Sequence, residues 1–194
     1  MAARPKILNI LAALAVPLTA FAASGFWQAH RANIGLDASG GGGGYGVQGA
    51  PARPVLDKDC VLRAAAFRMK ITLDAEKPKP AIHFAGETPL KLFQDSIEPQ
   101  WGIRPDIILN AYTESNNKIF LIDDAAYYAK MGRFIDDSLA HEYAHYLQVI
   151  YKGIPMKEFT EWEESEAVSV QTWFRDNYFK GRPPEGAPVC PKLS

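Results

Sequence analysis

The segment His141-Glu142-Tyr143-Ala144-His145 constrains this chain more than any other feature of its sequence. The 194 residues include only four histidines, and two of them stand here four positions apart. In a helix, positions i and i+4 lie on the same face, so both imidazoles can reach one metal ion. The surrounding residues, 134–151, contain neither Pro nor Gly and repeat apolar side chains at helical spacing. We therefore predict a helix that carries an H-E-x-x-H zinc motif. The alternative is a core helix whose two histidines only make hydrogen bonds.

A catalytic zinc site needs a third protein ligand besides the two histidines. No histidine follows His145, and Gln148 and Tyr151 occupy the positions where a longer motif would place its Gly and third His. A second helix is expected over residues 161–178, and it begins with a cluster of carboxylates. These are Glu161, Glu163, Glu164 and Glu166. One of them should be the third ligand, although a solvated first turn at the positive end of the helix dipole would also explain such a cluster. The helical pattern leaves Glu163, Glu164 and Glu166 open, and Glu163 also fits a capping box with Thr160.

His141 to His145, followed by Glu164-Ser165-Glu166-Ala167, resembles the gluzincin group of zincin metallopeptidases. In that group the motif helix is followed by a helix whose E-x-x-A segment supplies a glutamate ligand. The resemblance covers roughly residues 105 to 178 and implies that His141, His145 and Glu164 bind Zn²⁺, with Glu142 as the general base. Many members have Asp or Asn four residues after the glutamate ligand. Val168 stands there in this chain, so the resemblance identifies no side chain that would hydrogen-bond to a metal ligand.

These residues predict an exported zinc-dependent metallopeptidase that acts on a peptide or protein substrate. Zinc would activate a water molecule and polarise the scissile carbonyl, while Glu142 would pass the water proton to the leaving amine. The alternative is a non-catalytic zinc-binding zincin-like envelope protein that acts as a binding module. Five residues are chemically able to stabilise the oxyanion, and the sequence does not choose among them: His83, Tyr112, Tyr127, Tyr128 and Tyr151.

The N-terminal residues have the pattern of an export signal. Arg4 and Lys6 precede an apolar run, residues 7–22, that ends in Ala20-Phe21-Ala22, a small-x-small cleavage pattern. We predict a signal peptide over 1–23, a Gly-rich flexible linker over 24–55 and a single folded domain over 56–194. The protein would be periplasmic or secreted, with no stable membrane insertion after cleavage. An uncleaved N-terminal anchor is the alternative.

Cysteine content and charge add two further expectations. Cys60 and Cys190 are the only cysteines, and in an oxidising compartment they could form a disulfide that closes a loop of about 130 residues and contributes about 4 kcal/mol in the chain-entropy model. The net charge is −1 and the basic residues are scattered, which argues against a nucleic-acid partner. Nothing in the sequence indicates an oligomeric state.

The order of the expected elements predicts an α+β, zincin-like fold. The elements are a helix over 60–73, a strand over 81–85, a hairpin formed by 106–112 and 118–123, the motif helix, and a C-terminal helix that carries the third ligand. We expect the strands to form a small antiparallel sheet. We also expect the strand at 118–122 to offer a backbone edge to an extended peptide substrate.

Overall fold

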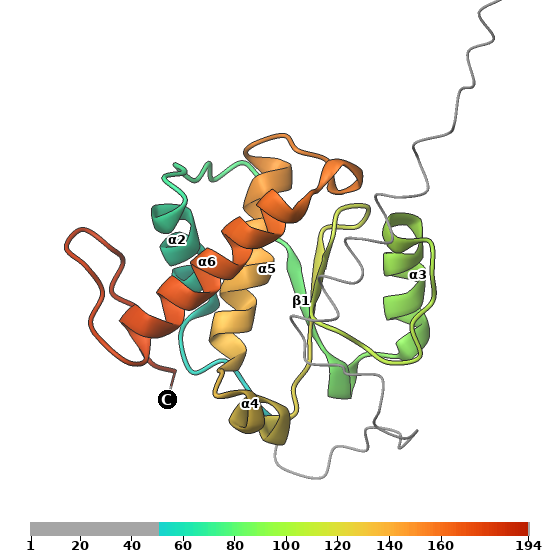
Figure 1. The fold of residues 1–194 in the computed structure, drawn as a ribbon, viewed down its shortest axis with the longest axis horizontal. Coiled ribbons are helices and arrows are strands. Elements are labelled where there is room, and N and C mark those ends of the chain that lie inside the picture. Colours follow the sequence, from blue (N-terminus) through green and yellow to red (C-terminus); the bar gives the residue numbers. More distant parts are fainter. Residues whose placement is uncertain (1–50, 194) are drawn as a thin grey trace, which may run out of the picture.

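Five α-helices and a three-stranded sheet make up residues 51–193, the part of the chain that the computed structural model describes (Figure 1). The helices are α2 (Lys58–Arg68), α3 (Leu90–Trp101), α4 (Ala125–Met131), α5 (Ile135–Ile150) and α6 (Glu161–Tyr178). The strands are β1 (Ala81–Phe84), β2 (Ala111–Thr113) and β3 (Lys118–Leu121), and 3-10 turns occur at Ala85–Glu87 and Met156–Glu158. The predicted α+β class is confirmed. The predicted signal peptide and most of the predicted linker lie outside the described residues.

The sheet is mixed, which corrects two predictions. Its strand order is β1-β3-β2, with β1 parallel and β2 antiparallel to β3. The expected purely antiparallel sheet is therefore wrong. Because β3 has a hydrogen-bonded neighbour on each side, residues 118–121 have no free backbone edge, and the expected pairing of this strand with a peptide is also wrong. Alternating residues identify a strand but not its partners, and the connection from β1 through α3 allows the parallel pairing.

Helix α5 occupies the centre of the domain. It packs against α2 and α6 on one side and against β2 and β3 on the other (Figure 1). Every residue from Ile135 to Val149 is buried, so the helix is enclosed on all faces. It ends at Ile150, and Gly153 follows with a φ of 69°, a conformation that glycine adopts without strain. The predicted motif helix is confirmed. A single apolar stripe implies one buried face, whereas this helix is buried on all faces.

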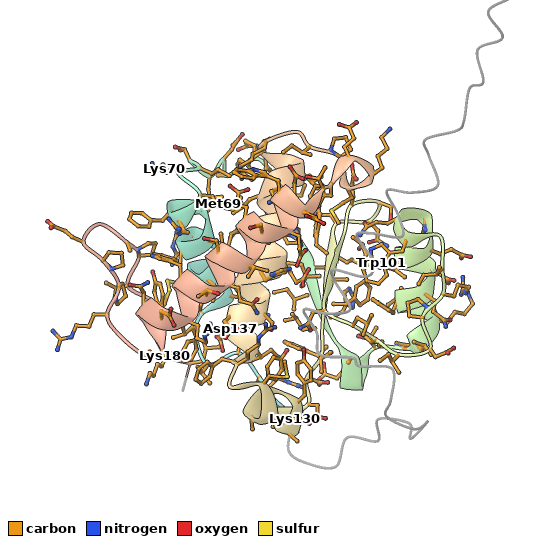
Figure 2. The ribbon with its side chains drawn as sticks, viewed as in Figure 1. Met69, Lys70, Trp101, Lys130, Asp137 and Lys180 are labelled. Carbon is orange, nitrogen blue, oxygen red and sulfur yellow. A yellow bond between two sulfur atoms is a disulfide. The ribbon has the colours of Figure 1, made fainter. Side chains whose placement is uncertain are left out.

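The two faces of the sheet pack against different helices. Along β3, Ile119 and Leu121 belong to the core that includes α5, whereas Phe120 packs with Phe93 of α3 at a ring-centroid distance of 5.1 Å. Figure 2 shows the side chains that fill these layers, with Trp101 at the end of α3. The sheet thus separates a small core under α3 from the larger core around α5.

Helix boundaries differ from the predictions in three places. The first helix ends at Arg68 rather than near residue 73, because Lys70 takes a left-handed conformation with φ 57°. Helices α3 and α4 were not predicted. Helix α3 includes Pro99, a residue that usually indicates a helix end, and α4 has only seven residues. The strand expected over 106–112 is a strand only at Ala111–Thr113.

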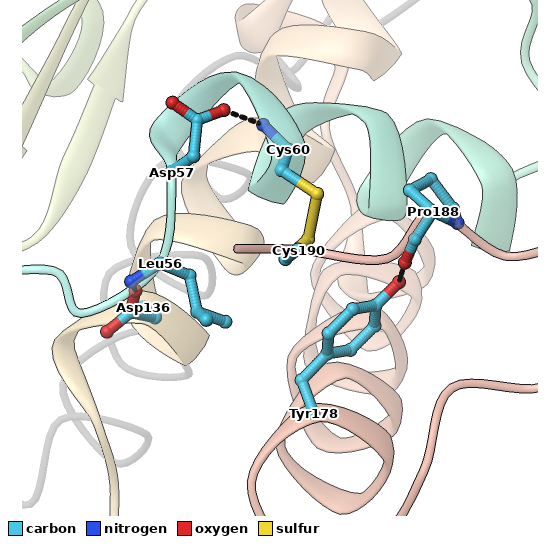
Figure 3. Close-up of a disulfide and its surroundings, with 7 residues drawn as sticks. All are labelled: Leu56, Asp57, Cys60, Asp136, Tyr178, Pro188 and Cys190. Carbon is cyan, nitrogen blue, oxygen red and sulfur yellow. Dashed lines mark hydrogen bonds between the residues drawn. A yellow bond between two sulfur atoms is a disulfide. The ribbon is translucent and has the colours of Figure 1, made fainter. Parts of the chain in front are cut away.

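Both ends of the described chain are tied to α2 and α5. The predicted disulfide is confirmed: Cys60, in the first turn of α2, is bonded to Cys190 in the C-terminal tail (Figure 3). Asp136 of α5 accepts hydrogen bonds from the backbone N–H groups of Val55 and Leu56. Contacts begin earlier still, because the N–H of Ala52 donates to the carbonyl of Asp123. The domain therefore makes ordered contacts a few residues before the predicted start at 56.

Within residues 51–193, no helix has both the length and the apolar character that a membrane span requires. The disulfide indicates folding in an oxidising environment, as in exported proteins.

Candidate metal centre

Helices α5 and α6 bring three potential metal ligands to one buried point. His141 and His145 project from successive turns of α5, and Glu164 lies in the first turn of α6. Thr160 sets the start of α6, because its hydroxyl accepts a hydrogen bond from the N–H of Trp162. One ligand atom from each of the two histidines and Glu164 lies within 4.8 Å of the others. The three side chains that the sequence and the resemblance proposed as ligands are thus close neighbours.

The distances between the ligand atoms are short enough for all three side chains to bind one metal ion. His141 Nε2 lies 3.1 Å from His145 Nε2, and the Glu164 carboxylate oxygens lie 3.5 Å from His141 Nε2 and 3.3 Å from His145 Nε2. Zinc binds imidazole nitrogen and carboxylate oxygen at about 2.0–2.2 Å in tetrahedral geometry, which places two ligand atoms about 3.3 Å apart. Two nitrogens and one carboxylate could therefore hold a metal ion with little rearrangement. The geometry does not identify the metal.

The electrostatics of this point favour positive charge. His145 is 2% exposed and Glu164 6% exposed, so neither is well solvated. Burial disfavours the charged imidazolium, but hydrogen bonding and Coulomb attraction to Glu164, with a contribution from Glu142, outweigh it and raise the pKa of His145 to about 9. A field that holds a proton also attracts a metal cation, which competes for the same nitrogen lone pair.

Glu142 adjoins the ligand group from the same helix. It follows His141 directly, is 1% exposed, and lies close enough for its charge to act on His145. A carboxylate enclosed in this way experiences a low dielectric, where its interactions with neighbouring charges are strong. Its position is consistent with acid–base chemistry at the metal site.

The two reserve glutamates have other partners. The Glu163 carboxylate accepts hydrogen bonds from the N–H and the hydroxyl of Thr160, which completes the predicted capping box. Glu166 forms a salt bridge with Lys152 at 2.6 Å and accepts a hydrogen bond from Gln148. Neither belongs to the group that could hold a metal ion. Among the acidic residues of this turn, Glu164 is the one that faces the histidines.

In the sequence, Gln148 occupies the position where a longer motif would place its glycine. In the structure its side-chain oxygen lies 2.9 Å from His145 Nδ1, on the far side of the ring from Glu164. A signal for this contact was present in the sequence. Gln148 lies three residues after His145, hence on the same side of the helix, and it is a polar residue within an otherwise apolar run.

Several candidates for oxyanion stabilisation have partners outside the ligand group. The hydroxyls of Tyr112 and Tyr128 donate to the Asn117 side chain and to the carbonyl of Ile122, and the Tyr151 hydroxyl donates to the carbonyl of Asp74. The two remaining candidates make ring contacts: His83 stacks on Phe120, and Tyr127 packs edge-on against Tyr128. These contacts indicate core or surface packing, and none of them identifies an oxyanion partner.

A pocket of about 290 Å³ lies elsewhere, between the C-terminal end of α2 and the first turns of α6. Met69, labelled in Figure 2, lies at the α2 end of this pocket. Neither histidine of the motif lines it, and Glu164 does not line it either.

Comparisons of the chain with protein-family models, with curated proteins and with solved structures find no match. A function for this chain therefore has to be inferred from the chemistry of the site itself.

Proposed function

We propose that this chain is an exported zinc-dependent metallopeptidase, in which His141, His145 and Glu164 hold the metal and Glu142 is the general base. The main support is the convergence of two imidazole nitrogens and one carboxylate at a single buried point. Imidazole ligands suit zinc, and three protein ligands leave one position open for chemistry, as in catalytic zinc sites. The resemblance of the two motif segments to gluzincins supports the same assignment.

A bound zinc ion would polarise a peptide carbonyl and lower the pKa of water at the site. The protein would supply the rest of the chemistry. Glu142, beside His141 and enclosed by the core, would accept a proton from the attacking water and deliver it to the leaving amine. His145 Nε2 would carry no hydrogen when the metal is bound, since a protonated nitrogen cannot ligate a metal. The disulfide supports export, and peptides or proteins are the proposed substrates.

The decisive experiment is Glu142→Gln in the full chain. The variant should retain one zinc per chain, because the three ligands remain, while cleavage of a quenched fluorescent peptide library falls at least about 100-fold with loss of the proton carrier. The matched control is Glu161→Gln, which makes the same change on the exposed start of α6 and should leave both quantities unaltered. Purified wild-type protein without stoichiometric zinc would overturn the proposal.

One observation favours a second candidate, a zinc-binding module without turnover. His141 and Glu164 each keep only 6% of their surface exposed, which leaves little room for a substrate in this conformation. The same experiment separates the candidates. A wild-type protein that holds zinc but cleaves no peptide in the library, with Glu142→Gln indistinguishable from it, would support the module.

A further inference from the structure

Gln148 connects the two helices that carry the ligand group. Its side chain is completely buried on α5, one turn beyond His145. The side-chain oxygen lies 2.9 Å from His145 Nδ1, while the side-chain nitrogen donates to the backbone carbonyl of Glu163 at 2.8 Å and to a carboxylate oxygen of Glu166 at 2.9 Å. His145 is one of the proposed ligands, and Glu163 and Glu166 lie within two residues of another, Glu164.

The partners of Gln148 determine which way its amide faces. A backbone carbonyl and an ionised carboxylate can only accept hydrogen bonds, so the NH₂ group must face Glu163 and Glu166. Lys152 Nζ forms a salt bridge with the Glu166 carboxylate at 2.6 Å. The amide oxygen then faces His145 and can only accept, so the hydrogen between them lies on Nδ1. In the neutral ring, which is the form that binds a metal, this arrangement leaves the Nε2 lone pair of His145 directed toward His141 and Glu164.

The same amide also anchors the backbone that carries the third ligand. The carbonyl of Glu163 belongs to the peptide bond that joins Glu163 to Glu164. One side chain therefore bonds the ring of one proposed ligand and the main chain next to another. A buried amide with two fixed acceptors has little freedom to rotate, so it holds both ligands in a constant relation.

We infer that Gln148 is a positioning residue for the metal centre: it orients the His145 ring, selects its Nδ1–H tautomer and holds Glu164 in place. The inference rests on metal binding in the proposed function and is independent of peptide hydrolysis. Gln148 also supplies the hydrogen bond to a proposed metal ligand that the apolar Val168 cannot make. Loss of such an outer partner typically lowers metal affinity 10- to 100-fold.

The test compares Gln148→Met with Gln171→Met. Gln171 is also a buried amide that joins α5 and α6, donating to Asp137 at 2.9 Å, but it lies two turns along α6 from Glu164. Both changes remove a buried amide between the same helices, so both should lower the thermal stability of the metal-free protein. Zinc affinity, measured by chelator competition, should fall about 10- to 100-fold in Gln148→Met and by less than about threefold in Gln171→Met.

Two further measurements keep the inference testable if Gln148→Met does not fold. Gln148→Glu retains an acceptor for His145 Nδ1. If both variants fold, it should lose less zinc affinity than Gln148→Met. If only Gln148→Glu folds, its zinc affinity should stay within about tenfold of wild type. In the zinc-loaded wild type, NMR should show a His145 Nδ1–H proton that is protected from solvent exchange.

The outcomes separate this inference from the proposed function. Equal zinc affinities in the folded Gln148 and Gln171 variants, or a rapidly exchanging Nδ1–H in the wild type, would overturn the positioning role while leaving zinc binding intact. A wild type that binds no zinc would overturn both. Zinc binding that depends on Gln148 in a protein without peptidase activity would support the inference and contradict the peptidase.

Discussion

The two ends of the α5–α6 helix pair bury the same kinds of groups for different purposes. At the metal end, defined by His141, His145, Gln148 and Glu164, donor atoms converge on one point. At the anchor end, defined by Asp136, Asp137, Gln171 and Arg175, each carboxylate faces its own donors. Asp136 accepts from backbone N–H groups, and Asp137 accepts from the Gln171 amide and the N–H of Phe134, with Arg175 at 3.8 Å.

The difference shows that buried polar residues alone do not define a site. The anchor-end carboxylates accept hydrogen bonds from neutral groups, and Arg175 adds a positive charge beside Asp137, which Figure 2 labels. The metal end gathers three ligand atoms at spacings that match one ion. We therefore expect changes at the anchor end to alter stability, and changes at the metal end to alter zinc affinity.

The largest expected effect comes from the disulfide between α2 and the C-terminal tail, which contains no residue of either end. Replacement of Cys60 and Cys190 by Ser should lower the free energy of unfolding by about 4 kcal/mol, because the unfolded chain regains the freedom of a loop closed over 130 positions. Denaturant unfolding would measure this loss, and the reduced wild type serves as the control. Zinc affinity of the folded variant should stay within about threefold of wild type, and a larger loss would show that the metal end depends on the disulfide.

At the metal end, Glu164→Gln should lower zinc affinity by more than about 100-fold, or about 2.8 kcal/mol of binding free energy, because a neutral amide replaces a charged ligand. Chelator competition would give the affinity. The matched control is Glu163→Gln, one residue earlier, where the side chain caps the helix and zinc affinity should change less than about threefold. A strong zinc loss in the Glu163 variant alone would move the ligand to that position.

The smallest effect concerns pH at the anchor end. Burial raises the pKa of Asp137 despite its hydrogen bond from Gln171, so the folded carboxyl keeps its proton to higher pH than the unfolded one. Its contribution to stability is therefore full below the unfolded pKa of about 3.9 and is lost as the pH rises through the folded pKa.

Asp137→Asn cannot ionise and should not show this loss. The free energy of unfolding of the variant, relative to wild type, should rise as the pH increases above about 3.9, the unfolded pKa. Asp176→Asn, where the side chain is 51% exposed, is the control and should show a smaller change. A relative stability that falls over this range would show that the ionised Asp137 is stabilising.

Helical periodicity was sufficient to predict α5 and α6, whereas α2 was predicted from its composition. Helices α2 and α6 also have side-chain caps. Periodicity missed α4, which is too short for a period to emerge, and α3, which contains Pro99. The parallel pairing of β1 with β3 depends on contacts between distant segments, which strand patterns do not encode.

The residues of the candidate site were predictable from the sequence where they lie close together in one motif. His141, Glu142 and His145 lie within one motif, whereas the choice of Glu164 over Glu163 and Glu166 depended on a family resemblance. The structure separates these glutamates by their partners, Thr160 for one and Lys152 for another. The role of Gln148 involves an amide bonded across two helices, and its spacing from His145 was the sole local sign of it.

The Cys60–Cys190 bond also makes most of the described chain a covalent ring (Figure 3). The whole sheet and helices α3 to α6 lie between the two cysteines. One peptide bond cut anywhere in that interval would yield two chains that remain joined, heavier than the intact protein by one water molecule. Such a nicked molecule would run as a single band on a gel without reductant, so a self-cleavage within that interval would give separate bands only after reduction.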